Sequence, residues 1–422
     1  MKELSDCRVL IVDDVKANVD ILVQALSGEY KLSVALGGLQ ALDAVRRSPP
    51  DLILLDIVMP DIDGYEICRR LRAAEATREL PIMFLSSLED VNDKARGFEV
   101  GGNDYLTKPF EILEVKARVR SLLKAKAYAE AVKAAAERDL RIAREIQMGL
   151  LPASISAQIQ GTGLDVHAVL EPARQVGGDL FEVLRLGADR VLVAVGDVSG
   201  KGIPAALFMA VAMTLLRSLA RQGNAPEEIL RKLNDELLEQ NPRGMFVTLQ
   251  CMVFDLAMGS VTCASAGHHP AVRITPGHAP RPAFMTPGRV LGLLPTDVFT
   301  SETLELETGE TFVLYTDGVS EAFDPNDELF GEERLMALLQ ASPGRSARET
   351  SLGVLEAVRR HAAGAQQSDD ITVVSVHYAR RASWHRCSAQ GPPEAWSYSR
   401  DTPVPITLSP VLRSSVFDPH ER

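Results

Sequence analysis

Three aspartates, a serine and a lysine in the N-terminal part of the chain have the order expected of a phosphoryl-transfer site. Asp13 and Asp14 end one apolar run, Asp56 ends the next, and Ser86 and Lys108 follow later short runs. If these runs are parallel strands, their carboxyl ends meet at one edge of a sheet. Crowded carboxylates there would repel one another without a divalent cation, and Mg²⁺ prefers oxygen ligands. With the metal bound, Asp56 can act as a carboxylate nucleophile, and Lys108 and Ser86 can contact the new phosphate oxygens.

Four further aspartates lie far apart in the second half of the sequence, each where a strand is expected to meet a loop. They are Asp179, Asp197, Asp317 and Asp369, and glycine stands beside the first three. Four converging carboxylates need cations to neutralise them. Two divalent metal ions about 3.5–4 Å apart, bridged by one acid and a water, would do so and would activate that water for in-line attack on phosphorus.

Two nucleotide motifs resemble parts of this second set. The stretch Val193–Gly202 looks like a phosphate-binding P-loop, but the spacing from Gly196 to Lys201 is one residue short, and Gly202 replaces the hydroxyl that would touch magnesium. The stretch G-G-D-L-F looks like the G-G-D-E-F hairpin of diguanylate cyclases, but Leu180 replaces the second acid. Both alternatives leave most of the aspartates without a role, so we favour the metal site.

The elements that must position the first set alternate between strands and helices. The runs Arg8–Val12, Asp51–Ile57 and Pro81–Leu85 are continuously apolar, as strands buried on both faces should be. Helical patterns lie between them, which is typical of a doubly wound parallel α/β sheet.

A long helix, or two nearly continuous ones, is predicted from Ile112 to Leu150, where there is no proline and glycine occurs only near the end. A heptad seam fits the residues Val115, Val119, Leu122, Leu140, Ala143 and Leu150, and it also includes Lys126 and Lys133. The pattern predicts a coiled-coil homodimer. The alternative is a single signalling helix that lies on a neighbouring domain.

From residue 161 to 378 strand-like runs dominate and two helical stretches interrupt them, which predicts an α+β domain. Residues 380–422 are rich in proline, serine and arginine, and we expect this tail to be mostly disordered.

The composition limits the partners and the compartment. The formal net charge of -12 disfavours nucleic acid and anionic membrane surfaces as partners. We see neither a signal peptide nor an apolar run long enough to span a bilayer. The chain has five scattered cysteines, Cys7, Cys68, Cys251, Cys263 and Cys387. Free thiols in a reducing cytosol are the simplest interpretation, so we expect a cytoplasmic protein.

Residues 6–122 closely resemble the receiver domain of bacterial response regulators, through the stretches I-V-D-D, L-L-D-I-V-M-P-D-I-D-G, F-L-S-S and D-Y-L-T-K-P-F. The resemblance implies a doubly wound five-stranded parallel sheet. It also implies that Asp56 accepts phosphate from a sensor histidine kinase or a phosphotransfer protein.

The same resemblance assigns roles to the other residues of this edge. Asp13, Asp14 and Asp56, with the backbone carbonyl of Val58, would bind Mg²⁺. Ser86 and Tyr105 would be the switch pair, and Lys108 would contact the phosphate. Since every motif is present, we expect an active receiver.

Residues 140–378 resemble the bacterial members of the metal-dependent (PPM-type) protein phosphatases, the serine phosphatases of sporulation and general-stress partner switching. The stretches that carry this resemblance are I-Q-M-G-L-L-P, P-A-R-Q-V-G-G-D-L-F-E, V-G-D-V-S-G-K-G-I-P-A-A-L, M-F-V-T-L, S-A-G-H-H-P-A, Y-T-D-G-V-S-E-A-F and S-D-D-I-T-V-V. The resemblance implies an α+β sandwich of β-sheets flanked by helices, with two Mn²⁺ or Mg²⁺ ions. Asp197 would bridge the ions with help from the Val198 carbonyl, and Asp179, Asp317 and Asp369 would complete the ligand set.

Five other residues near these motifs need an interpretation. Glu182 stands where the family often has a second Asp, which leaves an auxiliary metal position in doubt. His268 and His269 are better interpreted as loop or strand-end residues than as ligands, because this metal chemistry prefers oxygen. Arg174 and Lys201 could meet a substrate phosphate, but we expect solvated surface charges.

Together these patterns predict a receiver domain over residues 6–122, a helical linker over 123–152, a phosphatase domain over 153–378 and a tail over 379–422. The predicted function is a response regulator whose output is a protein serine/threonine phosphatase. Its expected substrate is a phosphoserine anti-sigma-factor antagonist.

Two alternatives belong to other functional classes. The first is a catalytically weak, phosphatase-like adaptor that binds a regulatory partner, and the full acid set argues against it. The second is a DNA-binding response regulator, and the acidic α+β output lacks the basic helical domain that it needs.

Overall fold

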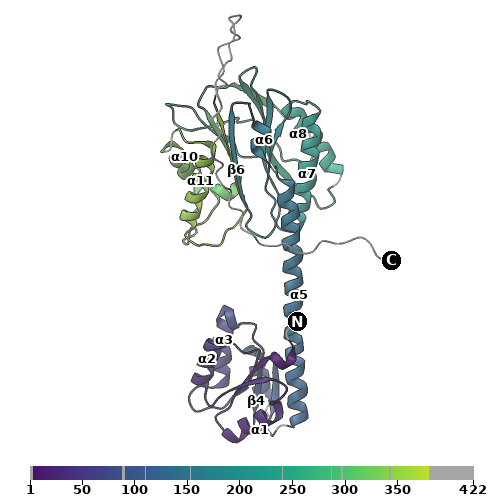
Figure 1. Cartoon of the computed structure of the whole chain (residues 1–422), viewed down its shortest axis with the longest axis vertical. Coiled ribbons are helices and arrows are strands. Elements are labelled where there is room, and N and C mark those ends of the chain that lie inside the picture. The colour runs from purple at the N-terminus through teal and green to yellow at the C-terminus, as the bar shows by residue number, and fades with distance from the viewer. Residues whose placement is uncertain are drawn as a thin grey trace, which may run out of the picture. The chain divides into compact units, whose positions relative to one another are not determined.

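Figure 1 shows the computed structural model of the chain. The structure describes residues 3–87, 91–109, 111–152, 154–239, 241–286, 288–295, 298–341 and 344–379. The tail for which we predict disorder lies outside the described residues.

The N-terminal α/β domain is built on a five-stranded sheet in the order β2-β1-β3-β4-β5, and every neighbouring pair is parallel. All residues of β3 and β4 are buried, as their continuous apolar sequences require. The predicted doubly wound parallel sheet is therefore confirmed. The strands are β1 (Arg8–Val12), β2 (Lys31–Ala35), β3 (Leu52–Asp56), β4 (Ile82–Ser86) and β5 (Asp104–Thr107).

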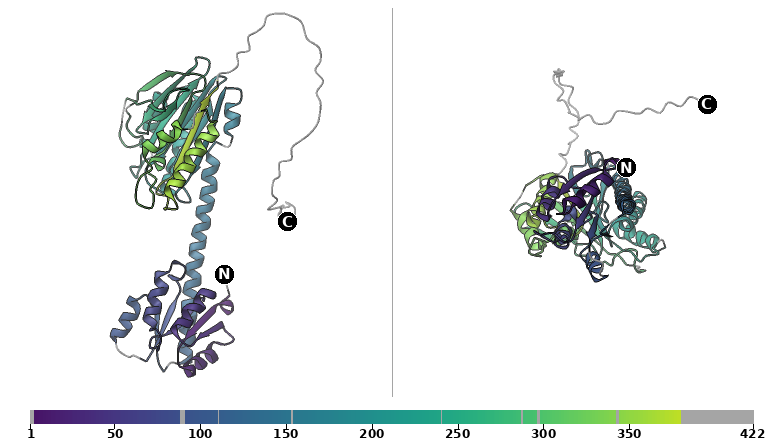
Figure 2. Two further views of the ribbon diagram at one scale, coloured as in Figure 1. Left: turned by 90° about the vertical axis from the view of Figure 1, so that its left-hand side faces the viewer. Right: turned by 90° about the horizontal axis from the view of Figure 1, so that it is seen from below.

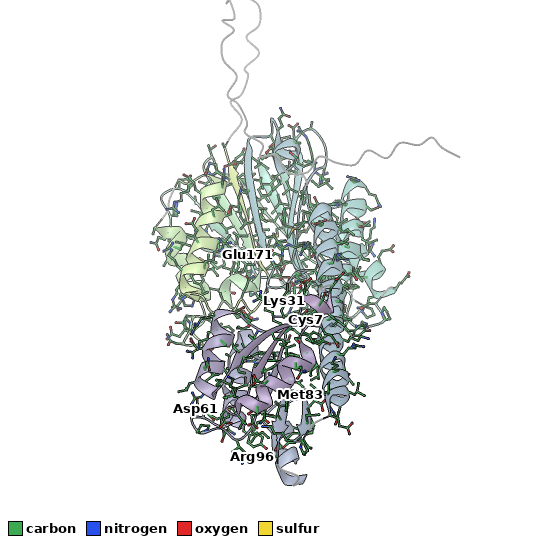
Figure 3. All side chains as sticks on the ribbon, turned by 60° about the horizontal axis from the view of Figure 1, so that its bottom comes forward. Cys7, Lys31, Asp61, Met83, Arg96 and Glu171 are labelled. Atoms are coloured by element: carbon green, nitrogen blue, oxygen red, sulfur yellow. The ribbon has the colours of Figure 1, made fainter. Side chains whose placement is uncertain are left out.

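Helices cover both faces of this sheet and make two separate cores. One core contains residues of α1 and the first turns of α5, and the other contains residues of α2 and α3. Met83 of β4 is fully buried, whereas the side chains of Asp61 and Arg96 are exposed (Figure 3). The helices are η1 (Leu4–Asp6), α1 (Lys16–Leu26), α2 (Gly38–Arg47), α3 (Gly64–Ala73), η2 (Glu75–Thr77) and α4 (Val91–Glu99).

Helix α5 (Ile112–Leu150) is one continuous helix of 39 residues, which is the first of the two arrangements that the sequence allows. Its first turns belong to the N-terminal domain, because Val115, Val119 and Leu123 are buried in that core. Further along, Lys126 Nζ lies 3.4 Å from Asp51 Oδ1 and so ties the helix to the start of β3.

The predicted heptad seam is wrong in its first half, because Val115 and Val119 are buried in the chain's own domain. A different stripe of α5 is exposed. It contains Tyr128, Val132, Ile142 and Ile146, which are 73%, 51%, 49% and 63% exposed. Hydrophobic periodicity alone could not tell which face of the helix the N-terminal domain would cover.

The second domain is a sandwich of two five-stranded sheets, and all neighbouring strands are antiparallel. One sheet has the order β13-β10-β9-β8-β7 and the other β12-β11-β14-β15-β6. The strands are β6 (Leu164–Glu171), β7 (Leu180–Arg185), β8 (Arg190–Val198), β9 (Val247–Asp255), β10 (Ser260–Ala266), β11 (Ala271–Ile274), β12 (Arg281–Ala283), β13 (Ser301–Glu305), β14 (Thr311–Tyr315) and β15 (Ile371–Tyr378).

Helices flank the outer face of each sheet (Figures 1 and 2). In β8, Val191, Val193 and Val195 point between the sheets, while Leu192 and Ala194 point toward the outer core under α7 and α8. Because both faces are covered, the strand is apolar at every one of these positions. The helices are α6 (Ile155–Ile159), α7 (Ile203–Arg221), α8 (Pro226–Glu239), α9 (Asp317–Ser320), α10 (Gly331–Gln340) and α11 (Ala347–Ala362).

The sequence analysis found no apolar run long enough to cross a membrane, but helix α7 is long and apolar enough to do so. By length and composition it is the one such helix among the described residues, with a mean hydropathy of 1.8. In the structure one face of this helix, including Met209, Ala212 and Leu216, is buried in the core beneath it, while Ile203 and Leu207 are 50% and 65% exposed.

Candidate active site and phosphorylation site

The acids of the N-terminal domain meet at the carboxyl edge of the parallel sheet. Asp13, Asp14 and Asp56 each place a carboxylate oxygen within 4.8 Å of the others, which is close enough to hold one cation. Lys108 Nζ lies 2.7 Å from Asp13 Oδ2 and 2.9 Å from Asp56 Oδ2. The predicted edge is therefore assembled, and the donor set of hard oxygens fits Mg²⁺.

Burial and the nearby charge of Lys108 shift the pKa of Asp56 in opposite directions. Burial raises the pKa of its carboxyl, while the hydrogen bond and the charge of Lys108 lower it, and the net shift is upward. Burial lowers the pKa of Lys108, but the bonds to Asp13 and Asp56 outweigh it and the net shift is again upward. Lys108 therefore stays a cation beside Asp56, where a phosphate would place new negative charge.

The other predicted residues of this edge lie around the acids. Ser86 is 1% exposed at the end of β4, and Tyr105 of β5 is 8% exposed. The backbone N–H of Lys108 donates to the Ser86 carbonyl at 2.6 Å. Val58 lies two residues after the end of β3 and is 60% exposed.

The four acids of the sandwich domain come from both sheets. Asp179 directly precedes β7, Asp197 lies near the end of β8, Asp317 starts α9 after β14, and Asp369 lies just before β15. The packing of the two sheets brings these four chain segments to one place.

Mutual repulsion is visible in the pKa of Asp197. Burial, followed by the charges of Asp317 and Asp369, raises it to about 7. Burial and then the charge of Asp197 raise the pKa of Asp179, and burial and then Asp369 raise that of Asp317. Acids that destabilise one another in this way are stabilised by cations.

The spacing of these acids differs from that in the N-terminal domain. Among the residues that the structure describes, Asp13, Asp14 and Asp56 are the only group of three or more potential ligand residues whose ligand atoms all lie within 4.8 Å of one another. The sandwich acids are spread more widely, which fits a set shared by two ions better than a set around one.

Two threonines that the sequence analysis missed fix the orientation of Asp179. The hydroxyls of Thr316 and Thr372 donate to Asp179 Oδ2 at 2.7 and 2.6 Å, and both threonines are fully buried. The Thr316 hydroxyl also accepts the N–H of Thr372 at 3.0 Å. The signal was present in the stretches Y-T-D-G and D-D-I-T, where each threonine lies close to an acid.

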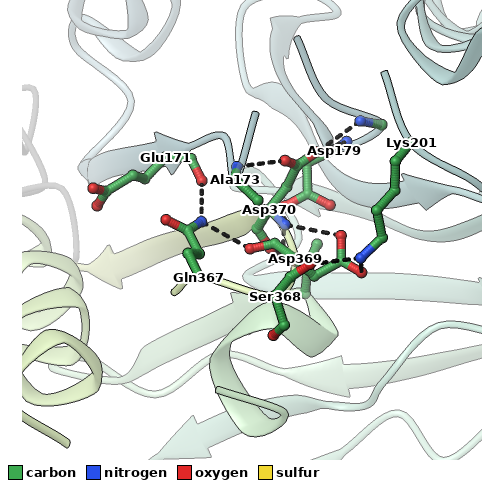
Figure 4. Close-up of polar contacts among 10 residues, drawn as sticks. Glu171, Ala173, Asp179, Lys201, Gln367, Ser368, Asp369 and Asp370 are labelled. Carbon is green, nitrogen blue, oxygen red and sulfur yellow. Dashed lines mark hydrogen bonds and ion pairs between the residues drawn. The ribbon is translucent and has the colours of Figure 1, made fainter. Parts of the chain in front are cut away.

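A second missed residue, Asp370, holds the loop that carries Asp179. Its carboxylate accepts the N–H groups of Ala173 at 2.8 Å and Gly178 at 2.7 Å (Figure 4). A Cβ on Gly177 would lie 1.9 Å from Asp370 Oδ2, so only glycine fits there. Asp370 therefore has a structural task, whereas its neighbour Asp369 faces the acid cluster.

Helix α5 reaches the same loop. Gln147 Nε2 donates to the Gly177 carbonyl at 2.6 Å, and Gln147 Oε1 accepts the Gly177 N–H at 3.2 Å. The last turn of α5 is also held, because Arg217 of α7 donates to the Leu150 carbonyl and forms an ion pair with Glu182.

Glu182 is therefore engaged away from the four aspartates. It is 2% exposed, and burial raises the pKa of its carboxyl, an effect that the charge and hydrogen bond of Arg217 offset only in part. The sequence analysis left open whether Glu182 could serve as an auxiliary metal ligand. In the structure its carboxylate forms an ion pair with Arg217 that joins β7 to α7.

The two histidines also have structural contacts. His268 is buried; its Nε2 donates to the Tyr315 carbonyl at 3.0 Å and its Nδ1 accepts the Thr248 hydroxyl at 2.9 Å. Burial lowers its pKa to about 3, so the ring is neutral. The ring of His269 stacks on Tyr315, with centroids 5.7 Å apart.

The two basic residues for which we expected solvated charges, Arg174 and Lys201, differ in their contacts. Arg174 is exposed, as expected. Lys201 is also exposed, as expected, but in addition its Nζ lies 2.8 Å from Asp369 Oδ2 (Figure 4). Sequence alone could not place these two residues together, because 167 positions separate Lys201 from Ser368, the neighbour of Asp369.

Two family matches fall within the two domains of the fold, and the second match begins after β7. Residues 9–120 match the response regulator receiver domain, and residues 187–379 match stage II sporulation protein E (SpoIIE). The SiaA-PP2C domain of Pseudomonas aeruginosa has a similar fold, with a TM-score of 0.53 and 22% identity over 59% of this chain and 99% of that one.

Two curated relatives are similar in sequence to different lengths of this chain. Protein IcfG of Synechocystis sp. is 28% identical over 400 residues, which cover 87% of this chain and 58% of IcfG. The response regulator PleD of Caulobacter vibrioides is 37% identical over 169 residues, which cover 40% of this chain and 36% of PleD. The chain thus spans less than two thirds of either relative. It carries a response regulator receiver domain over residues 9–120, fused to a SpoIIE-type phosphatase domain of the PPM class that is matched over residues 187–379.

Proposed function

We propose that this protein is a two-component response regulator whose output is a metal-dependent protein serine/threonine phosphatase. The observation that carries the proposal is the convergence of Asp179, Asp197, Asp317 and Asp369 on one place, where burial, followed by the charges of Asp317 and Asp369, raises the pKa of Asp197 to about 7. A fold that forces four carboxylates together in this way is suited to holding cations.

In the phosphatase site, two Mn²⁺ or Mg²⁺ ions would supply the Lewis acidity that activates water for attack on a phosphate ester. The chain's part is to hold them. Asp197, with help from the Val198 carbonyl, and Asp179, Asp317 and Asp369 would be the residues that hold these ions. A Cβ on Gly178 would lie 2.6 Å from the Val198 carbonyl oxygen, so glycine lets this loop approach Asp197 closely.

In the receiver, Asp56 would take phosphate from a sensor histidine kinase or a phosphotransfer protein. Asp13, Asp14 and Asp56, with the Val58 carbonyl, would hold Mg²⁺. Lys108, already 2.9 Å from Asp56, would contact the phosphate together with Ser86, and Tyr105 would change its contacts as the switch residue.

Helix α5 would carry the change to the phosphatase. Its first turns pack into the receiver core through Val115 and Val119, so a rearrangement of that core would move the start of the helix. Its last turns contact the loop of Asp179 through Gln147. The two states would differ in how this helix holds the loop, and phosphorylation would shift their populations.

The proposed client is a phosphoserine anti-sigma-factor antagonist, in keeping with the sporulation family of the output domain. Dephosphorylated antagonist would bind its anti-sigma factor and release a sigma factor. We propose that this occurs in the cytoplasm, without nucleic acid or membrane as a partner.

A homodimer through α5 is part of the proposal, in a register different from the one predicted. Tyr128, Val132, Ile142 and Ile146 recur at spacings of four and three residues, with Ala135 and Asp139 completing the series. A second copy of the helix would cover this stripe. Light scattering should give a dimer for the wild type and a monomer for Ile142→Lys, and a wild-type monomer at micromolar concentration would contradict the dimer.

The function is tested with p-nitrophenyl phosphate and with a phosphorylated antagonist from the same genome. Hydrolysis should require Mn²⁺ or Mg²⁺ and should fall by at least about a hundred-fold in Asp197→Asn. Asp235→Asn is the matched control, because Asp235 pairs only with Arg231 on the surface of α8. Absence of activity in the wild type would favour the adaptor, whereas activity without added metal would contradict the metal-dependent mechanism.

A further inference from the structure

Lys201 makes two polar contacts beside the proposed metal site. Its Nζ lies 2.8 Å from Asp369 Oδ2 and donates to the Ser368 carbonyl at 2.5 Å (Figure 4). The ammonium therefore contacts one of the four proposed metal ligands directly.

The conformation of the loop that carries Lys201 places this residue beside Asp369. It connects β8, which contains Asp197, to α7. Gly200 and Gly202 flank the lysine with φ angles of 89° and 76°, which side-chain-bearing residues rarely adopt. The ion pair thus joins the loop after β8 to the loop before β15, and these strands belong to different sheets.

Both oxygens of Asp369 are engaged. Oδ1 accepts the backbone N–H of Asp370 at 2.9 Å, and Oδ2 contacts Lys201. A divalent ion that binds Asp369 through Oδ2 must therefore replace the ammonium, since two cations on one oxygen repel each other strongly.

We propose that Lys201 is an internal counter-ion that a metal ion displaces from Asp369, so that Lys201 lowers the affinity of the phosphatase site for metal. This inference rests on the proposed function, because it assumes that the four acids bind metal. In the metal-free protein the lysine stabilises Asp369 against its acidic neighbours, and that stabilisation is lost when metal enters.

The test is Mn²⁺ binding to the full chain, measured by calorimetry and by the electron paramagnetic resonance signal of free Mn²⁺. All variants carry Asp14→Asn, which weakens the receiver's own acid cluster. Lys201→Met should bind Mn²⁺ about two- to five-fold more tightly than the parent protein, since a half-exposed ion pair contributes modestly. Lys201→Arg, which keeps the charge, should stay near the parent affinity.

Lys232→Met is the matched control, because Lys232 pairs with Glu228 at 3.1 Å on α8 and should leave Mn²⁺ affinity unchanged. The gain in Lys201→Met should shrink as salt screens the charges. Thermal unfolding of the metal-free proteins checks that the variants fold.

The possible failures are distinguishable. If Asp197→Asn abolishes Mn²⁺ binding but Lys201→Met binds with unchanged or lower affinity, the counter-ion inference is overturned and the metal site stands. If the parent protein binds no Mn²⁺ at these acids, the proposed function fails, and the inference fails with it.

Discussion

Gln147 and Gly177 exchange two hydrogen bonds, one in each direction, between helix α5 and the loop that leads to Asp179. Gln147 is 7% exposed, and its contacts with Gly177 are buried. Gly177 stands two residues before Asp179 and is confined on its other side by Asp370. The helix that starts in the receiver core therefore bonds directly to the backbone beside a proposed metal ligand.

Gln147→Ala should lower phosphatase activity. The substitution leaves a buried N–H and a buried carbonyl of Gly177 without their partner, which costs about 1–3 kcal/mol. If the loop moves to recover these bonds, kcat should fall by about ten-fold, and stimulation by a phosphodonor should be lost. The measurement is p-nitrophenyl phosphate hydrolysis with and without acetyl phosphate.

Gln158→Ala is the control for Gln147→Ala, because Gln158 also bonds a backbone N–H, that of Arg185, but away from the acids. Unchanged kcat and unchanged stimulation in Gln147→Ala would mean that this contact does not link the helix to the site.

Asp56→Asn should uncouple phosphatase activity from the phosphodonor, because the amide cannot act as the nucleophile that accepts phosphate. Phosphate-affinity gels should show phosphorylation of the wild type and none of the variant. Asp43→Asn is the control, since Asp43 is half exposed and pairs only with Arg47 on α2. Equal stimulation of the wild type and Asp56→Asn by acetyl phosphate would contradict the coupling.

The sequence predicted both folds and the positions of the acids because those features follow local rules. Continuous apolar strands indicate sheets covered on both faces, and an acid at the end of such a strand lies at its edge. Asp13, Asp56, Asp197 and Asp317 were found in this way.

The contacts that were missed depend on pairing between distant segments. Thr316 and Thr372 meet at Asp179 only because β14 pairs with β15. Lys201 reaches Asp369 only because the two sheets stack. Periodicity likewise could not decide which face of α5 would be buried, so the exposed stripe at Tyr128 and Ile142 was not predicted.

Thr372→Val should weaken metal binding at the phosphatase site. The change removes one of the two hydroxyls that donate to Asp179 Oδ2 and leaves the carboxylate freer to turn. Loss of such a supporting hydrogen bond typically weakens metal affinity by about ten-fold or more. Mn²⁺ titration measures the effect.

Two further variants serve as controls for Thr372→Val. Thr372→Ser keeps the hydroxyl and should restore most of the affinity. Thr350→Val removes a buried hydroxyl that bonds the Ser346 carbonyl on α11 and should leave Mn²⁺ binding unchanged. Equal Mn²⁺ affinity in Thr372→Val and the wild type would show that the hydroxyl does not orient Asp179.

Acid should destabilise the phosphatase domain partly through His268. Burial lowers its pKa to about 3 in the folded protein, against 6.5 for an ordinary histidine. The unfolded chain therefore takes up a proton below pH 6.5 while the folded protein does not, so the free energy of unfolding falls as pH decreases from about 7 toward 3. Between pH 7.5 and 5 this loss should be about 2 kcal/mol.

The contribution is isolated by comparing urea unfolding of the wild type and His268→Asn at the two pH values. The variant should be less stable at pH 7.5, because Thr248 and the Tyr315 carbonyl lose their bonds to the ring. It should also lose about 2 kcal/mol less than the wild type on acidification, since the titrating group is gone. His278→Asn, on an exposed turn, is the control and should behave as the wild type. An equal loss in all three proteins would show that His268 is not held neutral in the fold.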